Sequence, residues 1–126
     1  MTVTGTADAA GDGDRQTQLL RGVLDMCLLA LLAKEPAHGY ELVHRFDAAG
    51  FQPVGYGTIY PLLTRMRRLG LVADEMQASP SGPARKVYTL TDAGHARLRA
   101  WRQQWTHFVG TVDSTLTDSV PDSPRS

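Results

Sequence analysis

Residues 55–72, GYGTIYPLLTRMRRLGLV, indicate a short helix that ends at a glycine and is followed by a strand. At about 100° per residue, one side of this helix is apolar and can be buried, formed by Ile59, Leu62, Leu63, Met66 and Leu69. The other side is polar and basic, and it holds Tyr60, Pro61, Thr64, Arg67 and Arg68, with Arg65 at the border. A compact helix of this kind, followed by a strand and a basic hairpin, is typical of proteins that read a DNA major groove.

Proline and threonine set the expected start of this helix. Pro61 fits a first turn, where the N–H that proline lacks would have no partner within the helix. We therefore expect the helix to begin near Gly57 or Thr58, with the Thr58 hydroxyl as its cap.

Charge is distributed unevenly along the chain. The 126 residues include 13 basic and 13 acidic side chains, and a formal net charge of zero argues against a nucleic-acid binder. Residues 56–102, however, hold eight basic and three acidic side chains, a local charge of +5. Because salt screens the distant tails, a polyanion would sense mainly this local charge.

The composition gives little support to catalysis or metal binding. The single cysteine, Cys27, excludes an internal disulfide, and its apolar neighbours indicate a small buried side chain. The spacing and the acidic or thiol companions of a metal site are missing around His38, His44, His95 and His107. No phosphate loop, nucleophile elbow or pair of buried carboxylates is visible, so we expect neither a cofactor nor an enzyme.

The sequence also shows no sign of export or membrane insertion. No basic segment followed by an apolar core marks a signal peptide. The longest apolar run, Val23–Ala33, is too short to span a bilayer. We therefore expect a cytoplasmic protein without a membrane segment.

Two helices are predicted before residue 55. A wide apolar stripe predicts a central core helix from about Gln16 to Ala33, which Pro36 ends. A second helix is expected over about Tyr40–Ala49, with Leu42 inward and Arg45 outward.

Two strands and a long helix are predicted after Gly70. The strands are expected at about Leu71–Met76 and Lys86–Leu90. The prolines and glycine of the loop Ala78–Ala84 should forbid continued pairing between them. Thr91 should cap a last helix, about Asp92–Leu116.

Three helices, a two-stranded hairpin and a long last helix make up a winged helix-turn-helix architecture, mainly α with a small β-hairpin. We expect this domain over residues 16–91 and a dimerisation helix over residues 92–117. Residues 1–15 should form a disordered arm, and residues 118–126 a flexible tail.

The last helix carries an apolar seam with alternating spacings of three and four residues, formed by Leu98, Trp101, Trp105, Phe108 and Val112. A helix of about 25 residues is about 37 Å long, more than a small domain needs for its own core. The seam can pack against the first helix of the same chain or against a second copy of the chain. We favour the second copy, because two-fold dimers are the commonest oligomers.

Three motifs in this order, PAHGYEL at 36–42, GTIYPLL at 57–63 and RKVYTLTDAG at 85–94, resemble the PadR family of bacterial repressors. The single helix after the hairpin is similar to the short subfamily. The resemblance implies a homodimeric repressor that binds a palindromic operator in double-stranded DNA. It also implies a small aromatic or hydrophobic effector that often releases the operator.

The chain departs from the family pattern at three positions. Gly55 stands where serine or threonine is common, so the third helix can lack a side-chain cap. Arg67 stands where an acidic residue is common, which would add positive charge beside the groove. Val87 replaces a usual tyrosine of the hairpin, which can remove one backbone contact.

The predicted DNA contacts centre on Tyr60, Thr64 and Arg68, which recur every four residues and would face the groove together. Arginine can pair with guanine, and threonine can contact a thymine methyl. The alternative is a solvated helix face with ordinary surface charges. The remaining predicted contacts are Thr58, Pro61, Arg65 and Arg67 of the same helix, Arg85 and Lys86 of the hairpin and, by the resemblance, the phosphate contacts His38 and Tyr40.

Trp101 and Trp105 could line an effector cavity at a dimer interface, or they could serve only as its core. By the resemblance, Trp105 matches the tryptophan that sandwiches flat compounds in multidrug-responsive relatives. A ligand there would change the separation of the recognition helices, which should be about 34 Å for successive major grooves. Two other functions stay open: a winged-helix interaction module that touches no DNA, and an enzyme whose site cannot be named.

Overall fold

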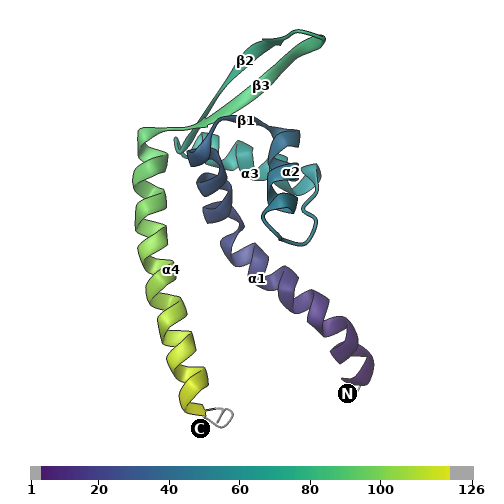
Figure 1. The fold of residues 1–126 in the computed structure, drawn as a ribbon, viewed down its shortest axis with the longest axis vertical. Coiled ribbons are helices and arrows are strands. Elements are labelled where there is room, and N and C mark those ends of the chain that lie inside the picture. Colours follow the sequence, from purple (N-terminus) through teal and green to yellow (C-terminus); the bar gives the residue numbers. More distant parts are fainter. Residues whose placement is uncertain (1–3, 120–126) are drawn as a thin grey trace.

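The computed structural model describes residues 4–119 of the chain. Within this range the elements follow in the order α1 (Thr4–Lys34), β1 (Ala37–His38), α2 (Gly39–Ala48), α3 (Tyr56–Arg68), β2 (Val72–Ser79), β3 (Gly82–Leu90) and α4 (Asp92–Ser119). Figure 1 shows the β2–β3 hairpin projecting from one end of a small helical body, while α1 and α4 extend the other way and diverge. The predicted winged helix-turn-helix with a long C-terminal helix is confirmed.

The hydrophobic core lies where α1, α2 and α3 meet the base of the hairpin. Its fully buried members are Leu28 and Leu29 of α1, Leu42 and Phe46 of α2, Ile59, Leu63 and Met66 of α3, and Leu71 and Val72. Burying one such side chain stabilises the fold by about 1.5–3 kcal/mol. The apolar face predicted for α3 is therefore the face that packs, and its opposite face is left at the surface.

The predicted apolar face of α3 is wrong at its last member. Leu69 is 53% exposed, because α3 ends at Arg68 and the chain turns away. Gly70 has a positive φ of 79°, a conformation that glycine adopts without a steric penalty. The Gly70 and Leu71 N–H groups then donate to the carbonyls of Arg67 and Met66, which closes the helix.

The hairpin is longer than the sequence predicted. Strand pairing continues to Gln77 opposite Arg85 and to Ser79 opposite Gly82, so only Pro80 and Ser81 form the turn. The predicted loop Ala78–Ala84 is thus wrong. Pro83 is accommodated because the register shifts between Gln77 and Ser79, and proline is tolerated at such irregularities.

A third strand escaped the sequence analysis. β1 has two residues, Ala37 and His38, which pair antiparallel with Tyr88 and Val87 of β3. The strand order is β1-β3-β2. Two residues are too few for an alternating pattern to be recognised.

The start and cap of α3 also differ from the prediction. The helix begins at Tyr56, and Gly55 occupies the cap position without a side-chain hydrogen bond. Thr58 is therefore not the cap, and Pro61 lies inside the helix instead of in its first turn. The N–H groups of Thr58 and Ile59 donate to the Gly55 carbonyl, so this turn forms without a polar side chain.

The helices at both ends of the chain are longer than predicted. α1 begins at Thr4 instead of near Gln16, so the part of the predicted disordered arm that lies within the described range is helical. Extending a helix that the core already holds costs little per residue, and alanine favours it. α4 continues to Ser119, and the rest of the predicted tail lies outside the described residues, as do residues 1–3.

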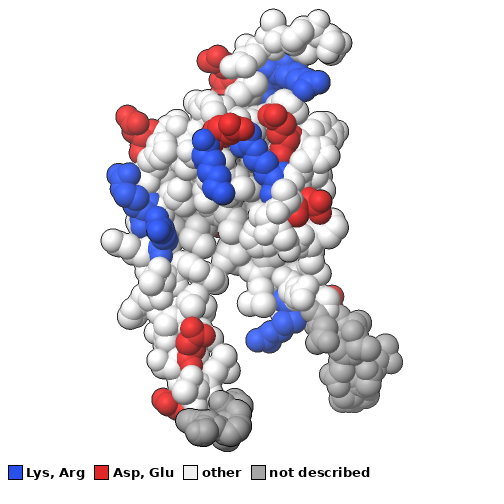
Figure 2. Space-filling model, in the orientation of Figure 1, with Lys and Arg blue, Asp and Glu red and all other residues white. Residues whose placement is uncertain are grey.

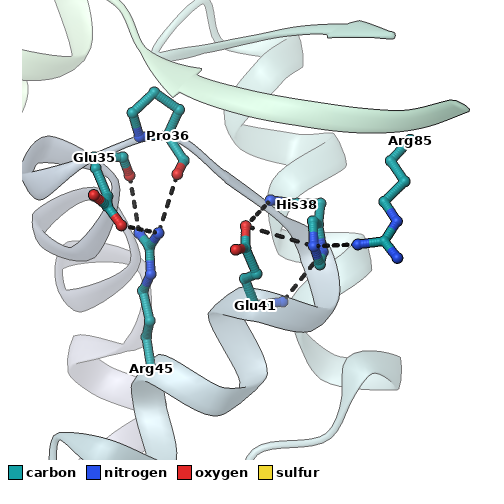
Figure 3. A network of polar contacts seen from close by, with 6 residues as sticks. All are labelled: Glu35, Pro36, His38, Glu41, Arg45 and Arg85. Carbon is teal, nitrogen blue, oxygen red and sulfur yellow. Dashed lines mark hydrogen bonds and ion pairs between the residues drawn. The ribbon is translucent and has the colours of Figure 1, made fainter. Parts of the chain in front are cut away.

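Arg45 joins α2 to the end of α1, although the sequence predicted an outward position for it. Its guanidinium donates to the carbonyl oxygens of Glu35 and Pro36 at 2.9 and 3.0 Å, and it pairs with the Glu35 carboxylate at 3.0 Å (Figure 3). A weaker bond of 3.4 Å reaches the Leu31 carbonyl. One side chain thus satisfies a carbonyl in the last turn of α1 and the two carbonyls that directly follow the helix.

The segment Gly13–Lys34 of α1 reaches the length and mean hydropathy of a membrane span. The shorter run Val23–Ala33 therefore understated the apolar part of this helix. Core helices of soluble proteins pass the same test, and the second half of α1 contributes Leu28, Leu29 and Leu32 to the core.

Candidate nucleic-acid interface and helical arms

The outward face of α3 carries the polar residues that the sequence assigned to it. Thr58, Tyr60, Pro61, Arg65, Arg67 and Arg68 are exposed, and Thr64 is half-buried. Tyr60, Thr64 and Arg68 therefore follow one another along the helix at one-turn spacing on the side away from the core. This arrangement leaves their side chains available to a partner.

The base of the hairpin adds cations next to α3. Lys86 on β3 and Arg67 on α3 both approach the carboxylate of Asp74 on β2, with N–O distances of 3.7 and 3.5 Å. Arg85, also exposed on β3, has a different neighbour, because its guanidinium is 2.9 Å from His38 Nε2. The structure thus brings together cations that lie about twenty residues apart in the sequence.

His38 is half-buried and has a structural role. Its Nδ1 accepts from the Glu41 N–H at 3.4 Å, while the Glu41 carboxylate accepts from the His38 N–H at 3.0 Å, which closes a capping box at the start of α2 (Figure 3). Its Nε2 faces the Arg85 donor. A neutral imidazole accepts at one nitrogen only, so the cap and Arg85 compete for that lone pair. The predicted phosphate contact would have to share His38 with both.

Tyr56 is a residue that sequence reasoning missed. Its ring stacks on Tyr40 at 4.4 Å between centroids and lies 5.6 Å from the ring of Tyr60. Burial raises the pKa of the Tyr56 hydroxyl, and the neighbouring tyrosines raise it further. Gly39 permits this stack, because a Cβ there would overlap the Tyr56 ring. Spacing of four residues from Tyr60 was the available signal, but Tyr56 lay before the predicted helix start.

The tyrosines border a hollow of about 560 Å3 at the junction of α2, α3 and the hairpin. Its lining includes Tyr40, Tyr56, Tyr60, Tyr88, His38, Arg85 and Lys86. Burial is also the main cause that raises the pKa of the Tyr88 hydroxyl. Aromatic walls and cations together suit a phosphodiester backbone.

The local charge of +5 divides between two parts of the molecule. Five basic residues, and the acidic Asp74 and Glu75, belong to α3 and the hairpin. Arg97, Arg99 and Arg102 belong to α4, where Arg97 lies 5.8 Å from the ring centre of Trp101. The surface predicted to contact DNA therefore carries a net charge of +3, smaller than the +5 of residues 56–102 as a whole.

The apolar seam of α4 divides into a covered and an exposed half. Leu98 and Trp101 are half-buried and pack against the core. Farther along, Trp105, Phe108, Val112 and Leu116 are 43%, 60%, 36% and 54% exposed. Packing against the same chain thus accounts for the first part of the predicted seam and not for the second.

The helices α1 and α4 diverge as two arms, and a wide groove separates them. It measures about 1220 Å3 and is lined mainly by apolar side chains of α1 and α4, among them Leu19, Val23, Trp101, Trp105 and Phe108. Figure 2 shows an open gap between the two arms, with scattered basic and acidic side chains on the viewed face of the arms.

Cys27 and Asp25 also line the groove. Cys27 is half-buried instead of fully buried as expected, and desolvation, followed by the Asp25 carboxylate, raises the pKa of its thiol. Among the described residues, no cluster of three or more His, Cys, Asp or Glu side chains could hold a metal ion.

Comparison with known proteins agrees with this geometry. Residues 28–100 match the model of the transcriptional regulator PadR-like family. The chain is 36% identical over 78 residues to the transcriptional regulator Rv3488 of Mycobacterium tuberculosis, covering 62% of this chain and 71% of that protein. It is 30% identical over 81 residues to the negative transcriptional regulator PadR of Bacillus subtilis, covering 63% of this chain and only 44% of that longer protein.

Solved structures resemble the fold over most of its length. A PadR family transcriptional regulator from Eggerthella lenta superimposes with a TM-score of 0.81 at 35% identity, covering 88% of this chain and 96% of that one. A PadR-like regulator from Bacillus cereus gives a TM-score of 0.72 at 40% identity, covering 79% and 96%.

Proposed function

Because this chain belongs to the PadR-like family of transcriptional regulators, we propose that it acts in the cytoplasm as a homodimeric repressor of a palindromic operator. Each protomer places α3 in a major groove of double-stranded DNA and lays the β2–β3 hairpin along the neighbouring backbone or minor groove. A small aromatic or hydrophobic effector relieves the repression.

The observation that carries the DNA-binding proposal is the division of α3 into two faces. Ile59, Leu63 and Met66 are completely buried, so the helix cannot rotate without exposing them. The opposite face is then held outward, and it offers a half-buried threonine and exposed arginines beside a basic hairpin. Fixed presentation of such groups at base edges is what direct readout needs.

The exposed half of the α4 seam supports the dimer. Two large aromatic and two aliphatic side chains in a row on one helix are costly to leave in water. A second copy of α4, related by a two-fold axis, would cover them and also fill part of the groove between the arms. The two-fold axis would present the two α3 helices to the two halves of a palindrome, which requires a separation of about 34 Å.

The groove between α1 and α4 supports the effector. It has aromatic walls from Trp101, Trp105 and Phe108, and a flat apolar ligand would remove these rings from water. A ligand held between arms of two protomers would shift their relative position and, with it, the separation of the two α3 helices.

Selection of bound fragments from a random DNA library tests the central proposal. We expect an enriched palindrome, and affinity for it that falls steeply between 50 and 200 mM salt as neutralised phosphates release counterions, a slope of about −0.9 per contact. Enrichment of no sequence, or binding that salt does not weaken, would instead favour an interaction module that touches no DNA.

A further inference from the structure

We infer that Asp74 is a built-in competitor of DNA phosphate, which limits how tightly this surface holds any DNA. The inference rests on the proposed function, since it assigns a role to one carboxylate within the proposed DNA-binding face. Asp74 is not among the residues predicted to contact DNA.

The position of Asp74 is central to this face. It lies on β2, opposite Tyr88 of β3, with α3 on one side. Its side chain is only 18% exposed, and a single carboxylate oxygen, Oδ2, is 3.5 Å from Arg67 Nη1 and 3.7 Å from Lys86 Nζ. These two cations come from different elements, so the carboxylate sits between the recognition helix and the hairpin.

The other cations of the face have no comparable partner. Arg85 lies 2.9 Å from His38 Nε2 and, within the described residues, forms no ion pair with a carboxylate. Within the described residues, Arg65 and Arg68 form no ion pair. Asp74 therefore neutralises cations that are half-exposed and otherwise suited to a phosphate.

A phosphate that approaches Arg67 and Lys86 must either displace this carboxylate or remain close to a like charge. The penalty depends on backbone phosphates, which every DNA sequence carries, and not on base edges. Asp74 thus lowers affinity for operator and random DNA by the same factor. It sets the affinity, whereas the exposed groups of α3 set the preference.

The test compares Asp74→Asn with the wild-type protein on operator and scrambled DNA. Removing one negative charge should make the dependence of log affinity on log salt steeper by about 0.9 per protomer. If the variant and the wild type bind DNA equally at 1 M salt, this steeper dependence gives the variant about fivefold higher affinity per protomer at 0.15 M salt. The ratio of operator to scrambled affinity should stay within about twofold. Asp74→Glu, which keeps the charge, should resemble the wild type.

Glu75→Gln is the matched control. It makes the same charge change one residue along β2, where side chains point to the other face and where no ion pair is formed among the described residues. We expect a smaller rise in affinity than for Asp74→Asn. Equal effects would overturn the inference, because net charge alone would then explain them.

Other outcomes also decide the question. Weaker operator binding by Asp74→Asn, or a lower preference for the operator, would show that Asp74 positions Arg67 and Lys86 instead of competing for them. Wild-type protein that binds no DNA would refute the proposed function and this inference together, whereas wild-type binding with an unchanged variant would refute the inference alone. Circular dichroism verifies that each variant is folded, and Asp74→Ser replaces Asp74→Asn should the latter unfold.

Discussion

The basic side chains of the proposed DNA-binding face differ in the partners that they have within the chain. Arg67 and Lys86 share the Asp74 carboxylate, and Arg85 contacts His38. Arg68 forms no ion pair within the described residues and lies one turn beyond Thr64 on α3. It gives up no internal partner on binding, so the strongest base contact should come from this residue.

We predict that Thr64→Ala combined with Arg68→Ala removes preference for the operator. Loss of the Arg68 contact alone should cost about 1–3 kcal/mol of discrimination against the wrong base. Both positions lie away from the core, so unfolding by urea should change little. Quantitative footprinting on operator and mutated operator measures the effect, and preserved preference would contradict the groove assignment.

At the scale of elements, the junctions between helices rest on a few side-chain-to-backbone bonds. Arg45 of α2 donates to two carbonyls at the end of α1, and Thr91 accepts from the Gly94 N–H to cap α4. The cap was predicted correctly, because threonine before a helix is a local signal. The Arg45 anchor was not predicted, because its acceptors lie about ten residues away and on another element.

We predict that Arg45→Ala lowers the free energy of unfolding by about 1–3 kcal/mol, because it leaves the carbonyls that follow α1 without a charged donor. Glu35→Gln should cost less than about 1 kcal/mol, since the Glu35 side chain is largely exposed and contributes only the ion pair. Urea denaturation measures both. A larger loss from Glu35→Gln would mean that the ion pair, and not the carbonyl bonds, joins the helices.

Two glycines of α4 give a matched pair of substitutions. A Cβ at Gly94 would overlap the Leu71 carbonyl oxygen and the Leu90 side chain, which fixes the close approach of α4 to the hairpin. A Cβ at Gly110 would meet nothing within 4 Å. We predict that Gly94→Ala destabilises the protein by about 1–3 kcal/mol. Gly110→Ala should stabilise it by about 0.5–1 kcal/mol through helix propensity.

Thermal unfolding distinguishes these glycine variants. We expect a lower Tm for Gly94→Ala and a higher Tm for Gly110→Ala. Equal shifts would show that helix propensity, and not contact with the hairpin, governs position 94.

At the scale of the whole molecule, the arms and the body serve different purposes. The body holds the core and presents α3 and the hairpin, while the arms carry apolar surface that the single chain leaves exposed (Figure 1). The same two helices border the groove. In the proposed function, dimerisation, operator spacing and effector response would therefore all depend on these arms, which lie away from the proposed DNA contacts.

We predict that Phe108→Asp yields folded monomers. Phe108 is 60% exposed in the single chain, so the change should leave the core intact while it places a charge within the proposed interface. Sedimentation velocity measures the oligomeric state. Operator affinity should also fall, because a monomer binds each half-site separately and loses the gain from binding both half-sites at once. His107→Asp is the control, since it adds a charge to the neighbouring position outside the seam. An unchanged dimer would place the interface elsewhere.

Aromatic ligands test the groove in the same molecule. We predict that Trp105→Ala weakens binding of a planar aromatic probe, measured by quenching of the remaining Trp101 fluorescence. Gln103→Ala, a change on α4 outside the groove lining, should bind the probe as the wild type does. Unchanged affinity after loss of Trp105 would mean that the ligand site lies elsewhere.

Local chemistry along the chain was enough to determine the winged helix-turn-helix, the two faces of α3, the Thr91 cap and the long apolar helix. Each of these features is indicated by residues that lie within one or two helical turns, or a few strand positions, of one another. The order of residues along the chain is therefore enough to predict them. Only the tertiary structure decided the contacts that join distant residues: the β1–β3 pairing, the Arg45 anchor, the Tyr40–Tyr56 stack and the shared carboxylate of Asp74. Such contacts arise when packing of the core brings separate elements together, and no periodic pattern along the chain records that proximity.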